Sequence, residues 1–481
     1  MADSLNQCKR ILIIGGGVAG LAAAHRLTEL AAAAARPLDL KLIEGLDRLG
    51  GSIVTRRKDG LLIEGGPDSF ITAKPWGLAL SRRLGIEQQL IPTNPACRRT
   101  FVVRRGRMYP IPEGFLLLAP TRIMPFVTSR LFSWPGKFRM GMDLLLPAKP
   151  LGPDDDESLG SFVRRRFGRE ALERVAQPLV GGIYTADPDK LSLRTTMPRF
   201  LEMEAQYGSL IRAMRKQMPA ARAAQANVDS GARYSMFVAF RDGMDTLVNA
   251  LADRLPTDAV QLGRSAETID YVDTTWRVRF RDGRHESADG LIVATPAHVT
   301  GGLVRDLDAT LADDLAAIPY ASSATLSLAV RRAQLGRLPD GFGFVVPFSE
   351  RRTIIAVTFS SIKFEDRAPA DRILMRAFLG GALQPDVYAL DDDSLYRAVM
   401  TDLRELIGLQ GEPEFTDLYR WPLSMPQYPV GHLLNVRRIE QRLAARRTIA
   451  FAGNGFSGVG IPDCVHSGEQ AAEKLFAALH E

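Results

Sequence analysis

The sequence predicts a protein of the α/β class, and three features of the chain carry this prediction. An apolar strand, a glycine-rich turn and a helix follow one another over residues 11–30, and a second apolar strand returns at 38–44. Helical patterns broken by prolines dominate residues 75–220, and strands of alternating polarity follow from about residue 260. A strand–helix–strand unit of the first kind is expected to hold its two strands parallel and side by side.

The chain is long enough for more than one domain. With 481 residues, two or three domains are expected, with an interior large enough to bury a cofactor. The hydrophobic share of 46% and the charged share of 24% are those of an ordinary soluble protein. The net charge of +6 is weak evidence for nucleic acid, and the basic clusters at 104–107 and 164–169 lack interleaved aromatics. We therefore expect no nucleic-acid partner, and solvated faces at both clusters.

Cysteine usage and hydropathy indicate a reducing compartment. Cys8, Cys97 and Cys464 are far apart and odd in number, so neither a disulfide framework nor a zinc spacing is available. The first ten residues lack the apolar core of a signal peptide, and no window reaches 18 uninterrupted apolar residues. A cytoplasmic location is expected.

One segment has two interpretations, and one of them involves contact with a membrane. Residues 115–132, FLLLAPTRIMPFVTSRLF, put aromatics and leucines beside Arg122 and Arg130. The segment is interpreted either as a buried core helix or as a helix that lies on a membrane surface.

The first turn has the spacing of a dinucleotide-phosphate loop. After the strand at 11–14, Gly15 permits the tight turn, Gly17 lets a pyrophosphate approach the backbone, and Gly20 lets the helix pack closely on the sheet. The free N–H groups and the dipole of the following helix favour phosphate. Glu44, at the end of the second strand, is expected to accept hydrogen bonds from a ribose diol.

Two further glycine pairs favour FAD over NAD. Gly50 and Gly51 follow the second strand in GLDRLGGSIVT, and Gly65 and Gly66 follow in GLLIEGGPDSF. FAD is long, and its ribityl chain and ring system need close backbone contacts beyond the first loop. The sequence therefore predicts FAD as the cofactor.

The later elements are predicted from local signals. The acidic run at 154–157 before SLGSFVRRRFG is expected to be a loop followed by a helix N-cap. Residues 274–283, TTWRVRFRDG, alternate in polarity and end in a hairpin signal, and 290–296 is a buried apolar strand. Residues 321–361 continue as strands of a further sheet.

The G-x-G-x-x-G spacing occurs a second time near the end of the chain, at Gly453, Gly455 and Gly458. An independent dinucleotide site needs another strand and an acid, but the remaining residues are predicted to form one helix. The loop is therefore expected to pass beside a ligand that is already bound by the first loop. The helix start at 459–461 would direct its dipole at the flavin pyrimidine ring.

The chain resembles the FAD-dependent amine-oxidase-like superfamily and, within it, the oxygen-dependent porphyrinogen oxidases of haem synthesis. The resemblance runs nearly end to end and rests on GGGVAG with Glu44, RLGGSIVT (48–55), EGGPDSF (64–70), GFGFVVP (341–347), FSSIKFEDRAP (359–369), MPQYPVGH (425–432) and GVGIPDC (458–464). It implies a Rossmann-like FAD-binding domain of separated segments, a mixed-sheet substrate domain and a helical region of the membrane-associating type. The expected boundaries are 1–75, 231–300 and 411–481 for the FAD domain, 95–220 for the helical region and 301–410, with neighbouring strands, for the substrate domain.

The resemblance also implies a set of cofactor contacts. They are Gly15, Gly16, Gly17, Val18, Ala19, Gly20, Glu44, Gly45, Gly51, Ser52, Gly65, Gly66, Pro67, Asp68, Val260, Trp421, Val459, Gly460 and Ile461. The backbone of Val260 would pair with the adenine, and Trp421 would lie near the cofactor. For both residues, a plain core role is an equally good interpretation.

The activity implied by the resemblance is the six-electron oxidation of a porphyrinogen to a porphyrin, with dioxygen as acceptor and hydrogen peroxide as product. The cofactor carries this chemistry, so no catalytic side chain and no metal are expected, and His432 is interpreted as structural. Arg98, Thr100, Phe344 and Phe359 are the expected substrate contacts.

Several alternatives stay open. The substrate is either protoporphyrinogen IX or coproporphyrinogen III. The protein is alternatively another flavin oxidase or desaturase of the superfamily, or a non-catalytic binder on the same fold. Peripheral membrane contact and a homodimer are further expectations.

Overall fold

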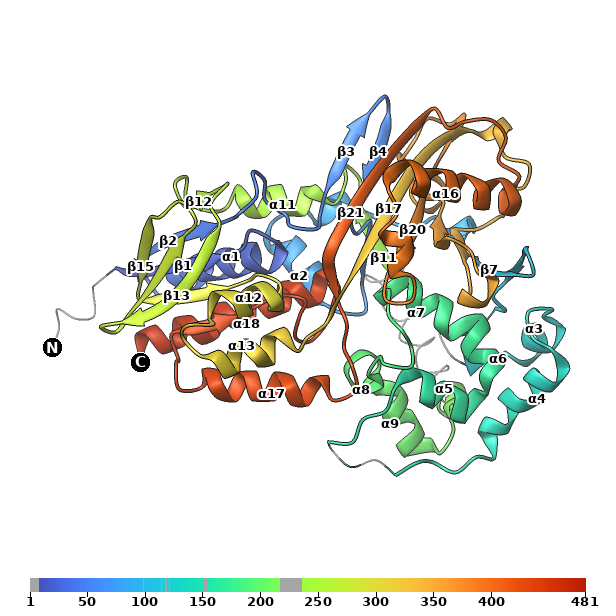
Figure 1. Ribbon diagram of the computed structural model, residues 1–481, viewed down its shortest axis with the longest axis horizontal. Coiled ribbons are helices and arrows are strands. Elements are labelled where there is room, and N and C mark those ends of the chain that lie inside the picture. Colours follow the sequence, from blue (N-terminus) through green and yellow to red (C-terminus); the bar gives the residue numbers. More distant parts are fainter. Residues whose placement is uncertain are drawn as a thin grey trace.

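The computed structural model describes residues 8–97, 99–113, 115–116, 119–120, 122–150, 152, 154–216 and 236–481. Its helices and sheets confirm the predicted α/β class, and they form two large sheets and a helical region (Figure 1).

The first large sheet is parallel and contains both ends of the chain. Its strands, in the order β12-β2-β1-β16-β22, are Val260–Gln261, Leu38–Ile43, Lys9–Ile14, Gly290–Val293 and Ile449–Phe451. The predicted βαβ unit is confirmed, because β1 and β2 are adjacent and parallel and α1 (Val18–Ala33) joins them. Strand β22 precedes the last helix, α18 (Ile461–His480), so residues from the two ends share one sheet.

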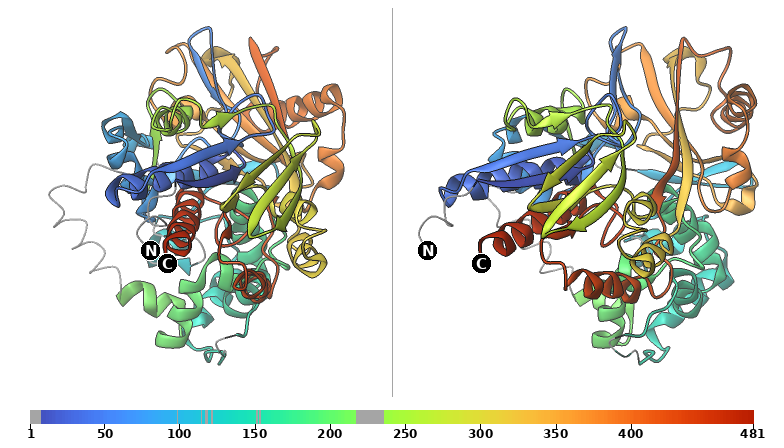
Figure 2. Two further views of the ribbon diagram at one scale, coloured as in Figure 1. Left: turned by 90° about the vertical axis from the view of Figure 1, so that its left-hand side faces the viewer. Right: turned by 60° about the vertical axis from the view of Figure 1, so that its left-hand side comes forward.

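Side chains of β1 point alternately to the two faces of this sheet, and a separate core covers each face. Ile11 and Ile13 are buried in one core with residues of α1 and α18, which run side by side (Figures 1 and 2). Leu12 and Ile14 are buried in another core, on the opposite face of the sheet. That face is covered by β13 (Ala266–Val272), β14 (Thr275–Phe280), β15 (His285–Ala288), α12 (Ala297–Leu303), α13 (Ala309–Ala316) and α17 (His432–Leu443).

The second large sheet is mixed and has seven strands. In the order β21-β17-β20-β19-β18-β7-β8 they are Phe415–Pro426, Tyr320–Arg331, Arg372–Gly380, Ile354–Thr358, Gly343–Val345, Thr100–Arg104 and Arg107–Pro110. Only the β18–β7 pair is parallel. Helix α16 (Asp392–Ile407) covers one face of this sheet, which we call the outer face.

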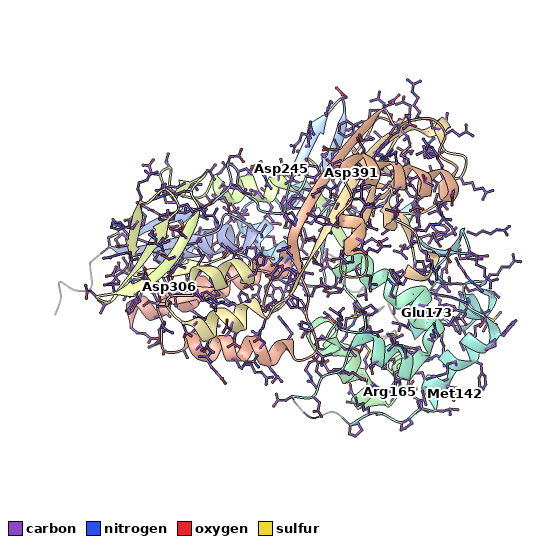
Figure 3. All side chains as sticks on the ribbon, in the orientation of Figure 1. Met142, Arg165, Glu173, Asp245, Asp306 and Asp391 are labelled. Carbon is purple, nitrogen blue, oxygen red and sulfur yellow. The ribbon has the colours of Figure 1, made fainter. Side chains whose placement is uncertain are left out.

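The helical region packs against the opposite, inner face of the seven-stranded sheet. Its helices are α3 (Ile123–Thr128), α4 (Trp134–Gly141), α5 (Leu159–Phe167), α6 (Arg169–Ala171), a π-helical turn at Leu172–Ala176, α7 (Gln177–Tyr184), α8 (Leu193–Thr196) and α9 (Pro198–Tyr207). Ser158 caps α5 by accepting a hydrogen bond from the backbone N–H of Ser161, as the sequence predicts for the end of the acidic run. The buried Arg166 pairs with the buried Asp143, and neighbouring Arg165, which Figure 3 labels in the helical region, pairs with Glu204.

Smaller elements connect the large sheets. A hairpin of β3 (Thr55–Lys58) and β4 (Leu61–Glu64) rises beside β21, and β5 (Phe70–Ile71), β11 (Phe237–Phe240) and β6 (Leu90–Pro92) form a three-stranded sheet (Figure 1). The other short elements are β9 (Phe115–Leu116), β10 (Ala119–Pro120), α2 (Trp76–Arg83), α11 (Asp245–Ala252), α14 (Ser360–Lys363) and α15 (Pro385–Tyr388).

The observed boundaries differ from the expected ones in three places. The expected helical region at 95–220 includes β7 and β8, which belong to the seven-stranded sheet. The expected substrate domain at 301–410 includes α13, which packs on the parallel sheet, so β17 is a better start for that unit. The expected FAD segment at 411–481 includes β21, which lies in the seven-stranded sheet.

The segment at 115–132 is not a single helix. Its described part contains two short strands and α3, whose Ile123 and Met124 are 58% and 70% exposed, while Phe126 is buried. Pro125 lies in the first turn of α3, where its missing N–H removes no hydrogen bond of the helix. Among the described residues, we find no helix that combines the length and the apolar character needed to cross a membrane.

Candidate active site

The first glycine loop is shaped by close contacts within the protein. Gly15 has a φ of +108°, which favours glycine, and its N–H donates to the carbonyl of Ile43 over 2.8 Å. A Cβ on Gly20 would overlap the carbonyl oxygen of Gly15, so α1 can approach the loop only with glycine there. Val18 and Ala19 are buried in the first turn of the helix.

Gly17, in contrast, faces open space. It is the N-cap of α1, and a Cβ placed on it would meet nothing closer than the Cα of Gly51, at 4.0 Å. The Gly50 N–H donates to the Gly16 carbonyl over 2.8 Å, which brings the second glycine pair to the mouth of the first loop. The two glycine turns, 15–20 and 50–51, together form what we call the glycine cradle, beside the free N–H groups at the start of α1. This cradle fits the pyrophosphate of a dinucleotide.

Glu44 follows β2 at the carboxyl edge of the parallel sheet. Its Oε2 accepts from the N–H of Gly16 over 2.6 Å, and its Oε1 accepts from the N–H of Leu46 over 2.8 Å. The strand of Val260 pairs with β2 at this edge, and Gly45 lies against Ser265. The structure thus brings Glu44, Gly45 and Val260 together beside the loop, where a ribose and an adenine would lie.

Arg48 is a residue of the site that the sequence interpretation missed. Its guanidinium donates to three backbone carbonyls, those of Leu49 (3.2 Å), Gly51 (2.7 Å) and Ile53 (3.3 Å), and so it shapes the turn around the second glycine pair. Its place in RLGG, between an acid and two glycines, was the available signal.

The turn after β4, residues 64–68, packs on the second glycine turn. A Cβ on Gly66 would overlap the carbonyl oxygen of Ser52, and a Cβ on Gly65 would lie 2.8 Å from the ring of Tyr419. The carbonyl of Gly65 accepts from Trp421 Nε1 over 3.0 Å and from Thr325 Oγ1 over 2.9 Å. Trp421, which is expected to lie near the cofactor, therefore makes a direct hydrogen bond to this turn.

Asp68 closes the same turn, directly after Pro67. Its two carboxylate oxygens each lie 3.0 Å from Lys363 Nζ, and one lies 3.6 Å from a terminal nitrogen of Arg376. Burial opposes ionisation of this carboxyl, but the charges of Lys363 and Arg376 outweigh it and lower its pKa. Asp68 is therefore a fixed anion that anchors the turn to the seven-stranded sheet.

The C-terminal loop connects two cores. Val459 packs against the core of the helical region, whereas Ile461, two residues later, is buried in the core shared by α1 and α18. A Cβ on Gly468 would overlap the carbonyl oxygen of Ala19, so the two helices touch at this point. The predicted meeting of the two ends of the chain is confirmed.

The start of α18 is joined to the N-terminal part by an ion pair. Asp463 accepts from Lys74 Nζ with both oxygens, at 2.6 and 2.7 Å, and it also accepts from the Gly460 N–H over 3.3 Å. Gly460 directly precedes the helix, as predicted. The dipole of α18 therefore begins beside residues that follow the turn at 64–68.

A cluster of neutral groups surrounds this helix start. Burial raises the pKa of Tyr184 to about 12 and that of Tyr320 to about 12, and it also raises the pKa of Tyr428, whose hydroxyl donates to the Asn454 carbonyl. Burial lowers the pKa of His432, and its Nε2 lies 2.9 Å from the Phe456 carbonyl oxygen, which agrees with the predicted structural role. The three tyrosines therefore keep their hydroxyl protons near neutral pH, and His432 is a neutral imidazole whose Nε2 is engaged by the Phe456 carbonyl.

The inner face of the seven-stranded sheet joins the turn at 64–68 to the helical region. Along β20, Leu374 packs on the β3–β4 hairpin, Arg376 contacts the turn, and Phe378 packs against the helical core. Val345 and Ala356 lie on the same face, 3.9 and 4.0 Å from the Cβ that would stand on Gly182 of α7. An apolar substrate held beside the cofactor would meet this face.

Two expected substrate contacts do not lie on the inner face. Phe344 and Phe359 are 1% and 0% exposed and belong to the core under α16. Side chains alternate along a strand, so Val345 faces the helical region and Phe344 faces away from it. In the structure these two rings are core residues, whereas Phe378 is one of the aromatic rings of the inner face.

Of the other two expected contacts, Thr100 lies near the edge of this sheet, one strand in from β8. Thr100 opens β7 and pairs with Gly343 of β18, on the same face as Val102 of the helical core. Arg98 lies outside the described residues.

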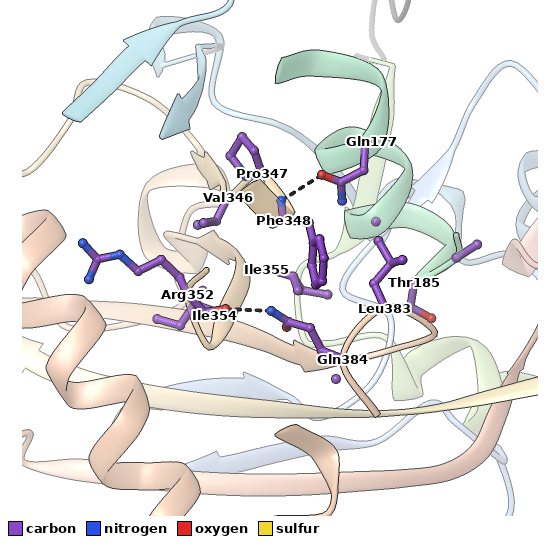
Figure 4. A pocket seen from close by; sticks show the side chains of 13 residues that line it. Gln177, Thr185, Val346, Pro347, Phe348, Arg352, Ile354, Ile355, Leu383 and Gln384 are labelled. Carbon is purple, nitrogen blue, oxygen red and sulfur yellow. Dashed lines mark hydrogen bonds between the residues drawn. The ribbon is translucent and has the colours of Figure 1, made fainter. Parts of the chain in front are cut away.

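A pocket of about 340 Å³, counting its open mouth, lies where α7 meets the seven-stranded sheet (Figure 4). Its polar rim includes Gln177, which accepts from the Phe348 N–H over 2.9 Å, and Gln384, which donates to the Arg352 carbonyl over 2.6 Å. Thr185, at the end of α7, completes the wall. The pocket is formed by other residues than the glycine cradle.

Comparison with known proteins places these features in a family. Residues 18–475 match the model of the flavin containing amine oxidoreductases. A coproporphyrinogen III oxidase of Bacillus subtilis is 35% identical, with 98% of both chains covered. Protoporphyrinogen oxidase 1 of Arabidopsis thaliana is 30% identical, over 96% of this chain and 87% of that protein.

A solved structure from Exiguobacterium sp. 255-15, whose description names protoporphyrinogen oxidase, has a TM-score of 0.86. It is 30% identical and covers 98% of this chain and 99% of its own. The glycine cradle and the acid at its edge fit FAD, and the flavin of the matching family confirms the predicted cofactor. The chain belongs to the family of flavin containing amine oxidoreductases.

Proposed function

We propose that the protein is an FAD-dependent porphyrinogen oxidase of haem synthesis and that its substrate is coproporphyrinogen III. The observation that carries this proposal is the similarity to a coproporphyrinogen III oxidase along 98% of both chains. The complete FAD cradle supports a redox enzyme over a non-catalytic binder, because a binder without redox chemistry has no need for it.

Bound FAD supplies the electron acceptor, and dioxygen is the proposed final acceptor, reduced to hydrogen peroxide. The residues of the chain bind and orient. Gly17 and Glu44 receive the nucleotide end, the turn at 64–68 and the start of α18 receive the ring end, and the inner face of the seven-stranded sheet holds the macrocycle.

Beside the ion pairs of Asp68 and Asp463, uncharged side chains form part of the surroundings of the ring end. Tyr184 and Tyr428 stay neutral because burial raises their pKa values, and Phe378 offers an apolar surface to a macrocycle. A porphyrinogen is an apolar macrocycle with carboxylates at its rim, so this apolar inner face suits its centre.

Protoporphyrinogen IX is the second candidate. The Arabidopsis relative and the Exiguobacterium structure carry its name. The two substrates differ at the rim, because coproporphyrinogen III has four carboxylates and protoporphyrinogen IX has two.

Anaerobic mixing separates the two candidates. The FAD-loaded enzyme is mixed with each porphyrinogen without oxygen, and the loss of flavin absorbance is followed in time. We expect faster bleaching, by about tenfold or more in kcat/KM, with coproporphyrinogen III. Equal rates, or faster bleaching with protoporphyrinogen IX, would contradict the substrate assignment, and bleaching with neither would contradict the function.

Peripheral contact with a membrane is also proposed, from the far end of the helical region. Trp134, Phe138 and Leu145 are 69%, 75% and 82% exposed there, and Lys137 lies over the Trp134 ring at 4.5 Å. Exposed apolar side chains beside cations suit a surface of anionic lipid.

Co-sedimentation with vesicles tests this contact. Wild-type protein is expected to bind phosphatidylglycerol vesicles more strongly than phosphatidylcholine vesicles, and Phe138→Ser is expected to weaken that binding. Leu262→Ser is the control, because Leu262 is 45% exposed next to β12, in the parallel-sheet unit. Equal binding of wild type and Phe138→Ser would contradict the contact.

A further inference from the structure

Arg376 occupies the middle of the inner face, between the cofactor cradle and the helical region. Its neighbours on that face are Leu374, which packs on the β3–β4 hairpin, and Phe378, which packs on the helical core. The residue is 4% exposed, and a charged side chain is this deeply buried only when specific partners hold it.

The known partners of Arg376 all belong to one turn. A terminal nitrogen donates to the carbonyl of Glu64 over 2.8 Å and also to the carbonyl of Gly66. The other terminal nitrogen lies 3.6 Å from the carboxylate of Asp68. A single guanidinium therefore fixes three residues of the turn that carries the third glycine pair, which only a forked donor can do.

One donor of the same guanidinium is left over. The Nε–H of Arg376 is buried and has no hydrogen-bond partner among the described residues. The guanidinium carbon lies 4.6 Å from the centre of the Phe378 ring, and a ring face does not replace an acceptor in the plane of the guanidinium. A buried N–H without an acceptor is unfavourable, so an acceptor from a bound molecule would complete this arrangement.

We propose that Arg376 is a positioning residue of the flavin site: it locks the turn at 64–68 in place, and its free Nε–H donates to a ring acceptor of the bound flavin. The inference rests on the proposed flavin-dependent function and names a residue that tunes it.

The test replaces Arg376 by lysine. Arg376→Lys keeps a positive charge beside Asp68 but has no Nε–H and no planar fork of donors. The matched control is Arg367→Lys, because Arg367 is 2% exposed and donates to the backbone carbonyls of Phe240, Arg241 and Glu365 rather than to carbonyls of the turn.

Three readouts are measured on protein loaded with FAD: the dissociation constant of FAD, the visible absorption spectrum and the midpoint potential of the bound flavin. For Arg376→Lys we expect FAD binding to weaken by about tenfold, with a shifted visible band and a changed potential. For Arg367→Lys we expect only lower thermal stability, with the spectrum and the potential of the wild type.

A wild-type spectrum, potential and FAD affinity in Arg376→Lys would overturn the inference. A change confined to the KM of the porphyrinogen would overturn it as well, because the free donor would then serve the substrate. If Arg376→Lys fails to fold, Arg376→Gln, which retains donors without the charge, is measured in the same way. Failure of the wild type to oxidise any porphyrinogen while these flavin effects persist would instead contradict the proposed function alone.

Discussion

At the scale of single residues, the glycines of the cradle have different roles. Gly20 is required by the protein itself, because a Cβ there would overlap the Gly15 carbonyl oxygen. Gly17 is free of such contacts, since nothing lies closer than 4.0 Å to the position of its Cβ. The empty space above Gly17 is therefore the space that a pyrophosphate would fill.

This difference predicts two distinct outcomes. Gly17→Val is expected to fold with near wild-type stability and to lose FAD, because its side chain occupies the cradle. Gly20→Val is expected to lower the free energy of unfolding by several kcal/mol, roughly 3 or more, because α1 must move away from the loop. The measurements are flavin content after purification and urea unfolding; Gly17→Val with full flavin content would show that the cradle is assigned wrongly.

Glu64 predicts a pH dependence. Burial raises the pKa of its carboxyl from the ordinary 4.5 to about 7, although Thr55 and the Met244 N–H donate hydrogen bonds to it. The folded state therefore binds more protons than the unfolded state between these two values, so this group makes the free energy of unfolding fall as pH rises through that window.

Glutamine does not titrate, so Glu64→Gln removes this decrease in the free energy of unfolding with rising pH. Relative to wild type, its free energy of unfolding is expected to increase by up to about 3 kcal/mol on going from about pH 4.5 to about pH 7. Urea unfolding of both proteins across this range measures the difference. A difference that is independent of pH would contradict the raised pKa.

At the scale of elements, the alternation along a strand decides which side chains reach the site. Phe378 points to the inner face, and Phe344 lies in the core under α16. Phe378→Ala is expected to lower kcat/KM for the porphyrinogen by at least about tenfold with a modest loss of stability. Phe344→Ala is expected to lower the free energy of unfolding by roughly 3 to 5 kcal/mol and to leave KM unchanged. The reverse pattern would contradict binding of the macrocycle at the inner face.

The contact between α1 and α18 supports a second prediction at this scale. Gly468→Leu is expected to force the two helices apart at Ala19 and to reduce both stability and FAD retention. Gly302→Leu is the control, because Gly302 is also a helical glycine but meets nothing within 4 Å. Thermal unfolding and flavin content are measured, and equal effects of the two changes would contradict a specific contact between the chain ends.

The elements also show which information is local in the sequence. The βαβ unit was predictable because its strand, turn and helix signals are contiguous, and the N-cap at Ser158 was predictable for the same reason. The face to which Phe344 points was missed because GFGFVVP contains no polar side chain that marks one face of the strand. In β20 such a marker is present: the polar Arg376 alternates with apolar residues, and it shows that Leu374 and Phe378 share its face.

At the scale of the whole molecule, the site is assembled from segments that are far apart in the chain. The cradle comes from the first 70 residues, the helix start from the last 25, and the inner face from strands between them. The motifs identified the first two parts, because each carries its own glycines.

The domain boundaries could not be found in this way. Strands β7 and β8 look like part of a helical region, but β7 pairs with β18, more than 200 residues later, and β8 pairs with β7. Helix α13 likewise joins the parallel sheet through packing, without any local signal. Arg376 was missed because two of its partners are backbone carbonyls, which leave no mark in a sequence.

The central claim is that both ends of the chain build a single flavin site. A crystal structure of the FAD-loaded protein tests it most directly. We expect electron density for the pyrophosphate above Gly17, the ribose at Glu44, and the ring system between the turn at 64–68 and the start of α18 at Ile461. Density for the flavin ring away from Ile461, with the start of α18 in contact only with protein, would contradict the claim.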